Sequence, residues 1–342
     1  MRQTILAGLG AGLISAVTFA SAATGTPLVQ FVLFLLTPLP VYLAGLGTGW
    51  FAAVVAGLSG GIALAIFTHP TAGLIFAATQ LAPAGLLTYL AQLARPVPAP
   101  TAQSGSPRQT HDQGGGLEWY PVGRLIVWSA VIAVILTTAM LLLLGQDVEA
   151  LRQSLREFIQ KVIEQGMPEQ GSGISPVSDA DLTTITDISL RLLPAITAIS
   201  LMGALLFNLW MAGRITLAAG RLRRPWPDVT IFTYPAGTPL LLAGTVLVAS
   251  YATGMSSLFA AAAGGVIYFA YVLLGLAILH NITRGNPWRP LILWSIYLGL
   301  LILNTGLTLV LVVMALVEPF SPIRRNFLRP PGPGPGPNGP SV

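Results

Sequence analysis

The run VGRLIVWSAVIAVILTTAMLLLLG, residues 122–145, carries a single charged side chain, Arg124. A helix of this length, rising about 1.5 Å per residue, crosses the roughly 30 Å of hydrocarbon in a lipid bilayer. In lipid the backbone amides need partners within the protein, so a long, uniformly apolar run predicts a helix, whereas a barrel would show shorter alternating segments. The run therefore predicts a transmembrane helix.

Runs of the same kind recur along the whole chain. Of its 342 residues, 54% are hydrophobic and 8% are charged, against about 25% charged in a soluble domain. The sequence therefore predicts an all-α polytopic transmembrane helix bundle with about eight or nine spans and no soluble catalytic domain. The expected spans lie near residues 4–24, 28–47, 49–68, 71–93, 122–145, 188–213, 232–252, 257–281 and 290–317.

The two ends of the bundle leave alternatives open. The first 24 residues also resemble a signal peptide, with an Ala20-Ser21-Ala22 cleavage pattern, although an uncleaved first helix is favoured in a chain with so many further spans. The last run is either one span or a broken or hairpin element around Asn304-Thr305-Gly306. A ninth full span would send the basic residues after it, Arg324 among them, to the outside, which the positive-inside rule disfavours.

Charge distribution predicts the orientation. The segment 146–187 contains eight acidic and three basic residues, whereas the loops on the other side of the expected spans carry clusters of arginine. Because basic residues are retained on the cytoplasmic side, we expect a multi-pass protein of the inner (plasma) membrane with a cytoplasmic N-terminus. The net charge of +5 then reflects topology and does not indicate nucleic-acid binding.

Composition divides the chain into four parts. Residues 1–93 form an N-terminal four-helix membrane part, and residues 122–318 form a C-terminal membrane part. Between them, residues 94–121 are rich in Pro, Gly, Ser and Gln and are expected to be a disordered cytoplasmic linker. The Pro/Gly tail, residues 319–342, is also expected to be disordered.

Residues 147–165 predict an amphipathic helix outside the membrane, because their apolar side chains fall at helical spacing on one face. Asp147 is expected to cap its start and Gly166 to end it. Such a helix would rest in the membrane interface, cover the mouth of the bundle as a lid, or bind a partner.

The sixth span is expected to extend beyond its apolar run. Ser178 and Asp181 have the spacing of a helix-capping pair, and Asp187 and Arg191 are expected to pair one turn apart. The sixth span is therefore predicted to be a long helix that protrudes outward.

Ionisable groups at membrane depth, which pumps and intramembrane enzymes require, are nearly absent. No Asp or Glu lies in the middle third of an expected span, and the three histidines, His69, His111 and His280, are scattered. The chain has no cysteine and no phosphate-binding or serine-nucleophile motif. We therefore expect a non-enzymatic protein with no metal and no cofactor.

Neutral polar side chains remain at depth. They are Gln30, Gln80, Asn208 and Asn304. Each is expected to bond a neighbouring helix, and the alternative is that some of them line a small polar pocket for an uncharged or zwitterionic solute.

A basic cluster follows the sixth span in GRITLAAGRLRRPWPDVTIF, residues 213–232. Its members are Arg214, Arg221, Arg223, Arg224 and Trp226. The arginines would contact anionic lipid headgroups, and the indole of Trp226 would lie at the membrane interface, so the cluster predicts an inner-face anchor. The alternative is a specific site for phosphate, nucleotide or anionic lipid.

Small residues recur at four-residue spacing in the first third of the chain, for example Gly8 with Gly12 and Gly57 with Gly61. This spacing lets helix backbones approach closely, either within the chain or against another subunit.

Three segments carry a resemblance to a known family: FNLWMAGRITLAAGRLRRPWPDVTIFTYP (207–235), GLAILHNITRGNP (275–287) and EPFSPIRRNF (318–327). Over about residues 5–328 the chain resembles the YybS-like integral membrane proteins, a family of unknown function. That family is distantly similar to the substrate-binding S components of energy-coupling factor vitamin transporters, six-helix bundles with both termini inside. The resemblance implies that the first six spans form such a bundle.

The same resemblance implies a docking face. In S components an Ala-x-x-x-Ala pattern on the first helix docks a coupling subunit, and Ala7 and Ala11 have this spacing. Two functions follow: a membrane protein that binds a small solute or lipid like an S component, with an energising partner, or an assembly protein that binds other membrane proteins through small-residue helix faces.

Overall fold

The structure is a computed structural model that describes residues 1–22, 26–96, 116–145, 147–166, 177–303, 305–321 and 323–324. Within these residues the protein is an all-α bundle, and seven helices are long and apolar enough to cross a membrane. The chain forms two compact units, Met1–Pro227 with Leu240–Val266 (unit 1) and Asp228–Pro239 with Ile267–Val342 (unit 2).

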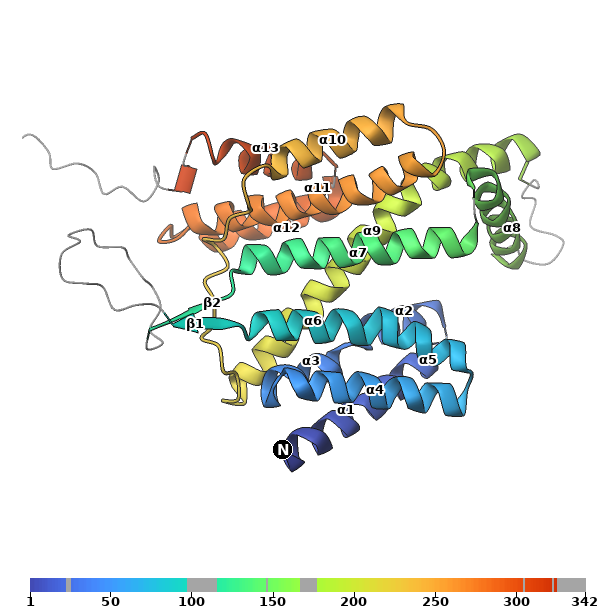
Figure 1. Ribbon diagram of the computed structural model, residues 1–342. Helices are drawn as coiled ribbons and strands as arrows, with labels where there is room; N and C mark the ends of the chain where they lie inside the picture. The colour runs from blue at the N-terminus through green and yellow to red at the C-terminus, as the bar shows by residue number, and fades with distance from the viewer. Residues whose placement is uncertain are drawn as a thin grey trace, which may run out of the picture. The chain divides into compact units, whose positions relative to one another are not determined.

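Unit 1 contains most of the helices (Figure 1). They are α1 (Arg2–Ser21), α2 (Pro27–Leu36), α3 (Leu39–Thr48), α4 (Trp50–Phe67), α5 (Pro70–Phe76), the π-helix η1 (Ala77–Leu81), α6 (Ala82–Ala91), α7 (Val122–Leu144), α8 (Val148–Gly166), α9 (Asp179–Ala218), most of α10 (Thr238–Tyr251) and the first part of α11 (Met255–Ile282).

The second expected span is broken into α2 and α3 at Pro38, which has no N–H to donate. Carbonyls at the break find partners on neighbouring helices. Ser15 of α1 donates its hydroxyl to the carbonyl of Thr37, and Asn208 of α9 donates its amide to the carbonyl of Leu35 at 2.7 Å. These bonds make the break tolerable at membrane depth.

The fourth expected span runs through α5, η1 and α6 as one element. Pro83 has no N–H to donate to the carbonyl of Thr79. The π turn just before Pro83 shifts the pattern of backbone hydrogen bonds along the helix. Gln80 lies in this π turn and is buried.

Helices α1 and α4 are packed at backbone distance. A Cβ added to Gly12 would lie 2.1 Å from the carbonyl oxygen of Ala56, and one added to Gly8 would lie 2.8 Å from that of Ala52. The four-residue spacing of Gly8 and Gly12 therefore serves helix packing within the chain.

The largest core joins the helices on both sides of the expected linker. Tyr42 of α3 and Leu87 of α6 lie in one buried cluster with Ile132 of α7 and Leu205 of α9. The division at 94–121 therefore does not separate two cores.

The two ends of the expected linker are ordered. Strand β1 (Ala94–Pro96) pairs antiparallel with β2 (Leu117–Trp119), and Tyr120 N–H donates to the carbonyl of Leu93 at 2.9 Å. The predicted disordered stretch is therefore too wide at both ends, and residues 97–115 lie outside the described residues.

Unit 2 contains the rest of α11, followed by α12 (Arg289–Leu303) and α13 (Thr305–Val317). Both ends of the α12–α13 pair reach the same loop. Arg284, just before α12, binds Asp228, and Arg324, after α13, donates to the carbonyl of Thr230 at 3.0 Å. Gly299 of α12 also faces Leu307 of α13. The last apolar run is therefore a hairpin, and its description as a single span over 290–317 is wrong.

The hairpin predicts which side of the membrane the tail occupies. Because Arg284 before α12 and Arg324 after α13 both bind the loop Asp228–Thr230, the hairpin returns the chain to the side where α11 ends. In the naturally cysteine-free chain, we expect Thr253→Cys, in the turn between α10 and α11, to react with an impermeant maleimide added to intact cells. Ser321→Cys should react only after permeabilisation, and labelling of Ser321→Cys in intact cells would show that the tail lies outside.

Candidate functional site

Helix α8 is docked against the first turns of α9. Arg152 Nη1 lies 3.0 Å from Asp187 Oδ1, and Arg156 binds both Asp179 and, at 3.2 Å, Thr183 Oγ1. The expected pairing of Asp187 with Arg191 is wrong, because α8 supplies the cation instead.

The predicted caps at this end of unit 1 are confirmed. Ala150 N–H donates to Asp147 Oδ1 at 2.8 Å, and Asp181 N–H donates to Ser178 Oγ at 3.1 Å. Helix α9 therefore begins at Asp179 and runs for 40 residues, well beyond the apolar run 188–213, as the sequence predicted.

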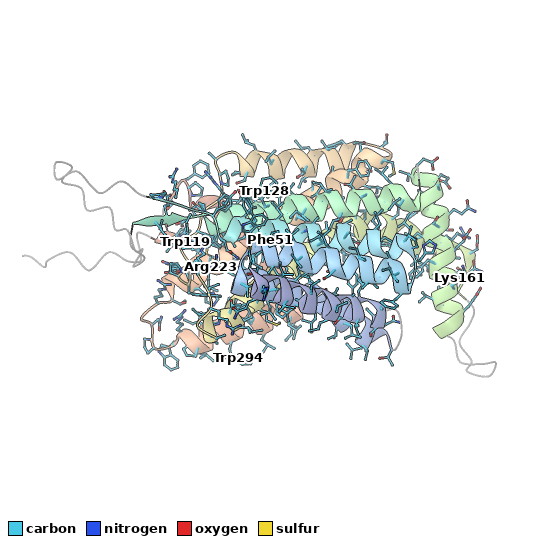
Figure 2. The ribbon with its side chains drawn as sticks, turned by 60° about the horizontal axis from the view of Figure 1, so that its bottom comes forward. Phe51, Trp119, Trp128, Lys161, Arg223 and Trp294 are labelled. Carbon is cyan, nitrogen blue, oxygen red and sulfur yellow. The ribbon has the colours of Figure 1, made fainter. Side chains whose placement is uncertain are left out.

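The two ends of unit 1 differ in chemistry. Arg223 and Trp119 lie at one end, and Lys161, on α8, lies at the other (Figure 2). The turn between α10 and α11 shares the α8 end, because Met255 and Leu258 pack with Leu151 of α8. We call this the α8 end.

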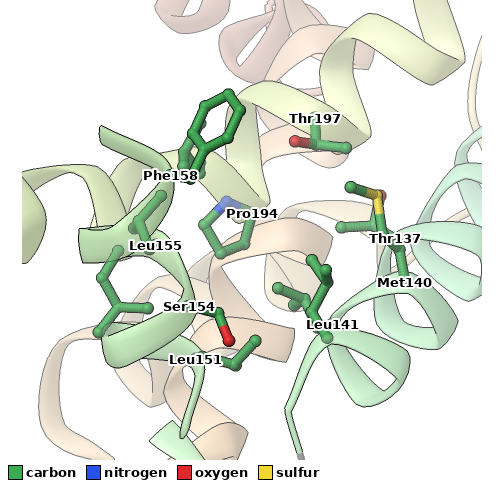
Figure 3. A pocket seen from close by; sticks show the side chains of 12 residues that line it. Thr137, Met140, Leu141, Leu151, Ser154, Leu155, Phe158, Pro194 and Thr197 are labelled. Carbon is green, nitrogen blue, oxygen red and sulfur yellow. The ribbon is translucent and has the colours of Figure 1, made fainter. Parts of the chain in front are cut away.

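A cavity of about 360 Å³ opens among α7, α8 and α9 at the α8 end. This volume is at the lower limit of ordinary ligand pockets. Figure 3 shows the lining side chains around the space. They are Thr137, Met140, Leu141, Leu144, Leu151, Ser154, Leu155, Phe158, Leu190, Leu193, Pro194 and Thr197.

Two features of the sequence create this cavity. Leu151, Leu155 and Phe158 lie on one face of α8 at helical spacing, so the helix presents an apolar side to α7 and α9. On α9, Pro194 is buried within the helix and lacks the N–H that would bond the carbonyl of Leu190. The interior proline leaves α9 without one backbone bond beside the cavity.

The cavity wall carries hydroxyl groups but no charge. Ser154 and Thr197 contribute hydroxyls from opposite helices, and neither forms a side-chain hydrogen bond with another described residue. Thr137 is almost fully buried, and its hydroxyl is also unpaired among the described residues. The wall can therefore accept an apolar molecule and offer it a few neutral hydrogen bonds.

The four polar residues expected at depth do not meet in this cavity. Asn208 joins α9 to α2 through the carbonyl of Leu35, which is the helix-to-helix bond predicted for it. Gln80 lies in η1 and donates to Thr79 Oγ1 at 3.3 Å, and Gln30 is half-buried on α2. Asn304 lies outside the described residues.

The basic cluster of residues 214–226 lies against helix ends. Arg223 reaches the carbonyl of Thr48 at the end of α3, and Arg224 reaches that of Ala91 at the end of α6, each at 3.4 Å. These are long contacts, but they place cations at two helix C-termini, where the helix dipole favours them.

The indole of this cluster has a cationic neighbour. The guanidinium of Arg214 lies 5.2 Å from the centre of the Trp226 ring, a cation–π distance. Arg221 is exposed. Arg223 of this cluster lies at the end of unit 1 opposite α8 (Figure 2), and the role of the cluster as an inner-face anchor stays a prediction.

Unit 2 contains a polar cluster that the sequence did not reveal. Asp228 accepts hydrogen bonds from Arg284 at 2.8 and 2.7 Å and from Thr230 N–H at 2.9 Å. Burial raises the pKa of the Asp228 carboxyl, but the hydrogen bonds from Thr230 and Arg284 outweigh it and hold this pKa below its usual range.

The same cluster includes a nearly buried ion pair. Arg324 Nε lies 2.9 Å from Glu318 Oε1, and both side chains are only 12 to 13% exposed. Asn281, almost fully buried, donates to Thr230 Oγ1 at 3.2 Å. These contacts connect the loop before α10 with the ends of the hairpin, so the cluster fastens unit 2 together.

The two described histidines lie apart from one another in the chain. His69 is exposed and caps α5, and His280 stacks near Tyr297 in unit 2. Within the described residues no three metal-ligating side chains come together. His111 lies outside the described residues.

The cavity residues escaped the sequence analysis because most of them are leucines in ordinary apolar runs. Two features of the sequence indicate the position of the cavity. The lid alternative for residues 147–165 located α8, and Pro194 inside an apolar run marks a local defect in a membrane helix.

The bundle of long apolar helices defines a polytopic α-helical membrane protein. A family model described as predicted membrane protein (DUF2232) matches residues 13–317. The chain belongs to this family. No curated protein and no solved structure matches it.

Proposed function

We propose that this protein is non-enzymatic and binds a small solute or lipid in the cavity among α7, α8 and α9, in the manner of an S component. The observation that carries the proposal is the cavity itself, a partly open apolar space with hydroxyl groups that are unpaired among the described residues. Its wall has no carboxylate, histidine or lysine, so it offers binding without a side chain that could act as acid or base or activate one of its hydroxyl groups as a nucleophile.

Helix α8 supports the same function as a cover. Its docking face lines the cavity, whereas its arginines bind carboxylates on α9. Half-exposed ion pairs of this kind contribute only about 0–1 kcal/mol each. The ion pairs are therefore weak, and α8 is also held by apolar packing, in which Leu151 is buried with Leu190 and Leu258. The docking of α8 over the cavity favours the lid interpretation over a helix that merely rests on lipid.

Fewer observations favour the alternative function, an assembly protein that binds other membrane proteins. Gly8 and Gly12 are occupied by α4, and Ala11 packs partly against the main core. Docking of a coupling subunit on Ala7 and Ala11 stays a prediction, because a partner would have to use the part of this face that the chain itself leaves open.

Thermal unfolding of the purified full chain with a panel of vitamins, nucleotides and lipids tests the proposal. A ligand of the folded state raises stability by mass action, by about 2.7 kcal/mol at one hundred times its dissociation constant. We expect such a shift for at least one compound. It should be lost in Thr197→Phe, which fills the cavity, and kept in Ile196→Phe, the neighbouring exposed position.

A complete absence of shifts in the native chain, or a shift that survives in Thr197→Phe, would reject the cavity as the binding site. The assembly function would then be preferred.

A further inference from the structure

The lining of the cavity restricts the chemistry of what it can hold. Its twelve side chains include nine apolar residues, three hydroxyl groups and no charge. A charged group moved into such a place without a partner is strongly disfavoured. The wall therefore selects against ionic ligands of either sign.

Two of the cations that flank lining residues are already paired, whereas Arg191, next to Leu190, is exposed. Arg152 and Arg156 alternate with the lining residues of α8, but they bind Asp187 and Asp179 of α9. Each cation is neutralised by a carboxylate, so neither is available for an anionic ligand unless α8 leaves α9.

The rim of the cavity is apolar and exposed. Phe158 is 63% exposed, Leu144 52% and Met140 50%. On a protein that spans a membrane, exposed apolar side chains beside the last turns of a spanning helix face hydrocarbon or its boundary, since water disfavours them. The cavity therefore opens toward the bilayer at the α8 end.

From these three observations we infer that the ligand is an uncharged, largely apolar molecule that partitions into the membrane and enters the cavity sideways beneath α8. Its apolar part fills the space bounded by the leucines of α7, α8 and α9. A single hydroxyl or carbonyl group is matched by the hydroxyls of Ser154 and Thr197. This inference rests on the proposed binding function and names the ligand class for the same cavity.

A cysteine reporter in the cavity tests the ligand class. Leu193→Cys places the only thiol of the chain on the cavity wall and keeps the hydroxyls of Ser154 and Thr197. Its reaction with N-ethylmaleimide is followed in nanodiscs. Three probes with the same twelve-carbon chain are compared at pH 8: 1-dodecanol, dodecanoate and dodecyltrimethylammonium. We expect 1-dodecanol to slow the reaction about tenfold, by mass action, when its content in the nanodiscs is ten times the content that halves the rate. The two ionic probes should change the rate by less than about twofold, because their head groups cannot be neutralised in the cavity.

Thr253→Cys, in the exposed turn between α10 and α11, is the control for general effects on the bilayer. Its rate should be the same with all three probes. Equal or better protection of Leu193→Cys by either ionic probe would overturn the ligand class while leaving a binding cavity in place. If 1-dodecanol fails to protect although another uncharged compound raises the unfolding temperature, the inferred shape of the ligand is wrong. Failure of every compound in both assays would instead remove the proposed function.

Discussion

Replacing Gly12 with leucine is expected to destabilise the protein more than any other single change in unit 1. A Cβ at this position would lie 2.1 Å from both the carbonyl oxygen of Ala56 and the hydroxyl oxygen of Ser59. One of these atoms belongs to the backbone of α4, so a side-chain rotation cannot relieve the clash. The helices must separate, and the contacts along α1 and α4 weaken together. We expect a cost at or above the upper end of the ~1–3 kcal/mol that overpacking usually produces.

Gly10→Leu is the matched control for Gly12→Leu. It lies on the same helix two residues away, but a Cβ there meets no atom within 4 Å. The yield of monodisperse protein in detergent and the apparent unfolding temperature at one scan rate should fall for Gly12→Leu and stay near native for Gly10→Leu. Similar losses in both variants would mean that the α1 sequence is sensitive to bulk in general, and that the close contact with α4 is not the cause.

Length and hydropathy determine the spans, and these could be read from the sequence. The run 122–145 becomes α7 within one residue, because nothing but a helix satisfies its backbone in lipid. The extension of α9 to Asp179 could be anticipated from the capping pair Ser178 and Asp181. Both features depend on residues close together in the chain.

The hairpin of α12 and α13 illustrates what local signals leave open. Its 28 residues, 290–317, have the mostly apolar composition and the length of a single span. Whether this run forms one span or a hairpin depends on Arg324, which donates to the carbonyls of Thr230 and Phe232 more than ninety residues earlier. Such long-range contacts have no signature in hydropathy, although the unfavourable position of the basic tail residues indicated that one full span was too many.

The cavity was even less accessible to sequence reasoning. The residues named for the alternative of a polar pocket, such as Asn208 and Gln80, were chosen because they are polar. Asn208 is instead used to bond the broken α2–α3 span. The observed cavity is apolar and arises from the way α8 crosses α7 and α9, which depends on the pairing of Arg152 with Asp187. An apolar cavity is a property of packing, and no single residue type marks it.

Removing the carboxylate of Glu318 is expected to have the largest effect in unit 2. Glu318 Oε1 binds Arg324 Nε at 2.9 Å, and its Oε2 accepts the N–H of Ile323 at 2.9 Å. In Glu318→Ala the guanidinium of Arg324 would remain in a place where only 13% of the side chain is exposed. Breaking a buried pair from one side costs about 3–5 kcal/mol, because the other charge is left uncompensated. Arg324 would then leave the carbonyls of Thr230 and Phe232, and the end of the hairpin would lose its attachment.

Glu118→Ala provides the comparison, because Glu118 also pairs with an arginine, Arg95, at 2.7 Å, but the two side chains are 48% and 77% exposed. An exposed pair contributes about 0–1 kcal/mol, so this variant should unfold close to the native temperature. The two variants should also differ locally: maleimide labelling of Ser321→Cys in purified protein should be faster with Glu318→Ala and unchanged with Glu118→Ala. If Glu318→Ala behaves like Glu118→Ala in both measurements, the hairpin is held by its apolar contacts with α11, such as the close approach of Gly275 to Leu311, and the ion pair contributes little to the fold of unit 2.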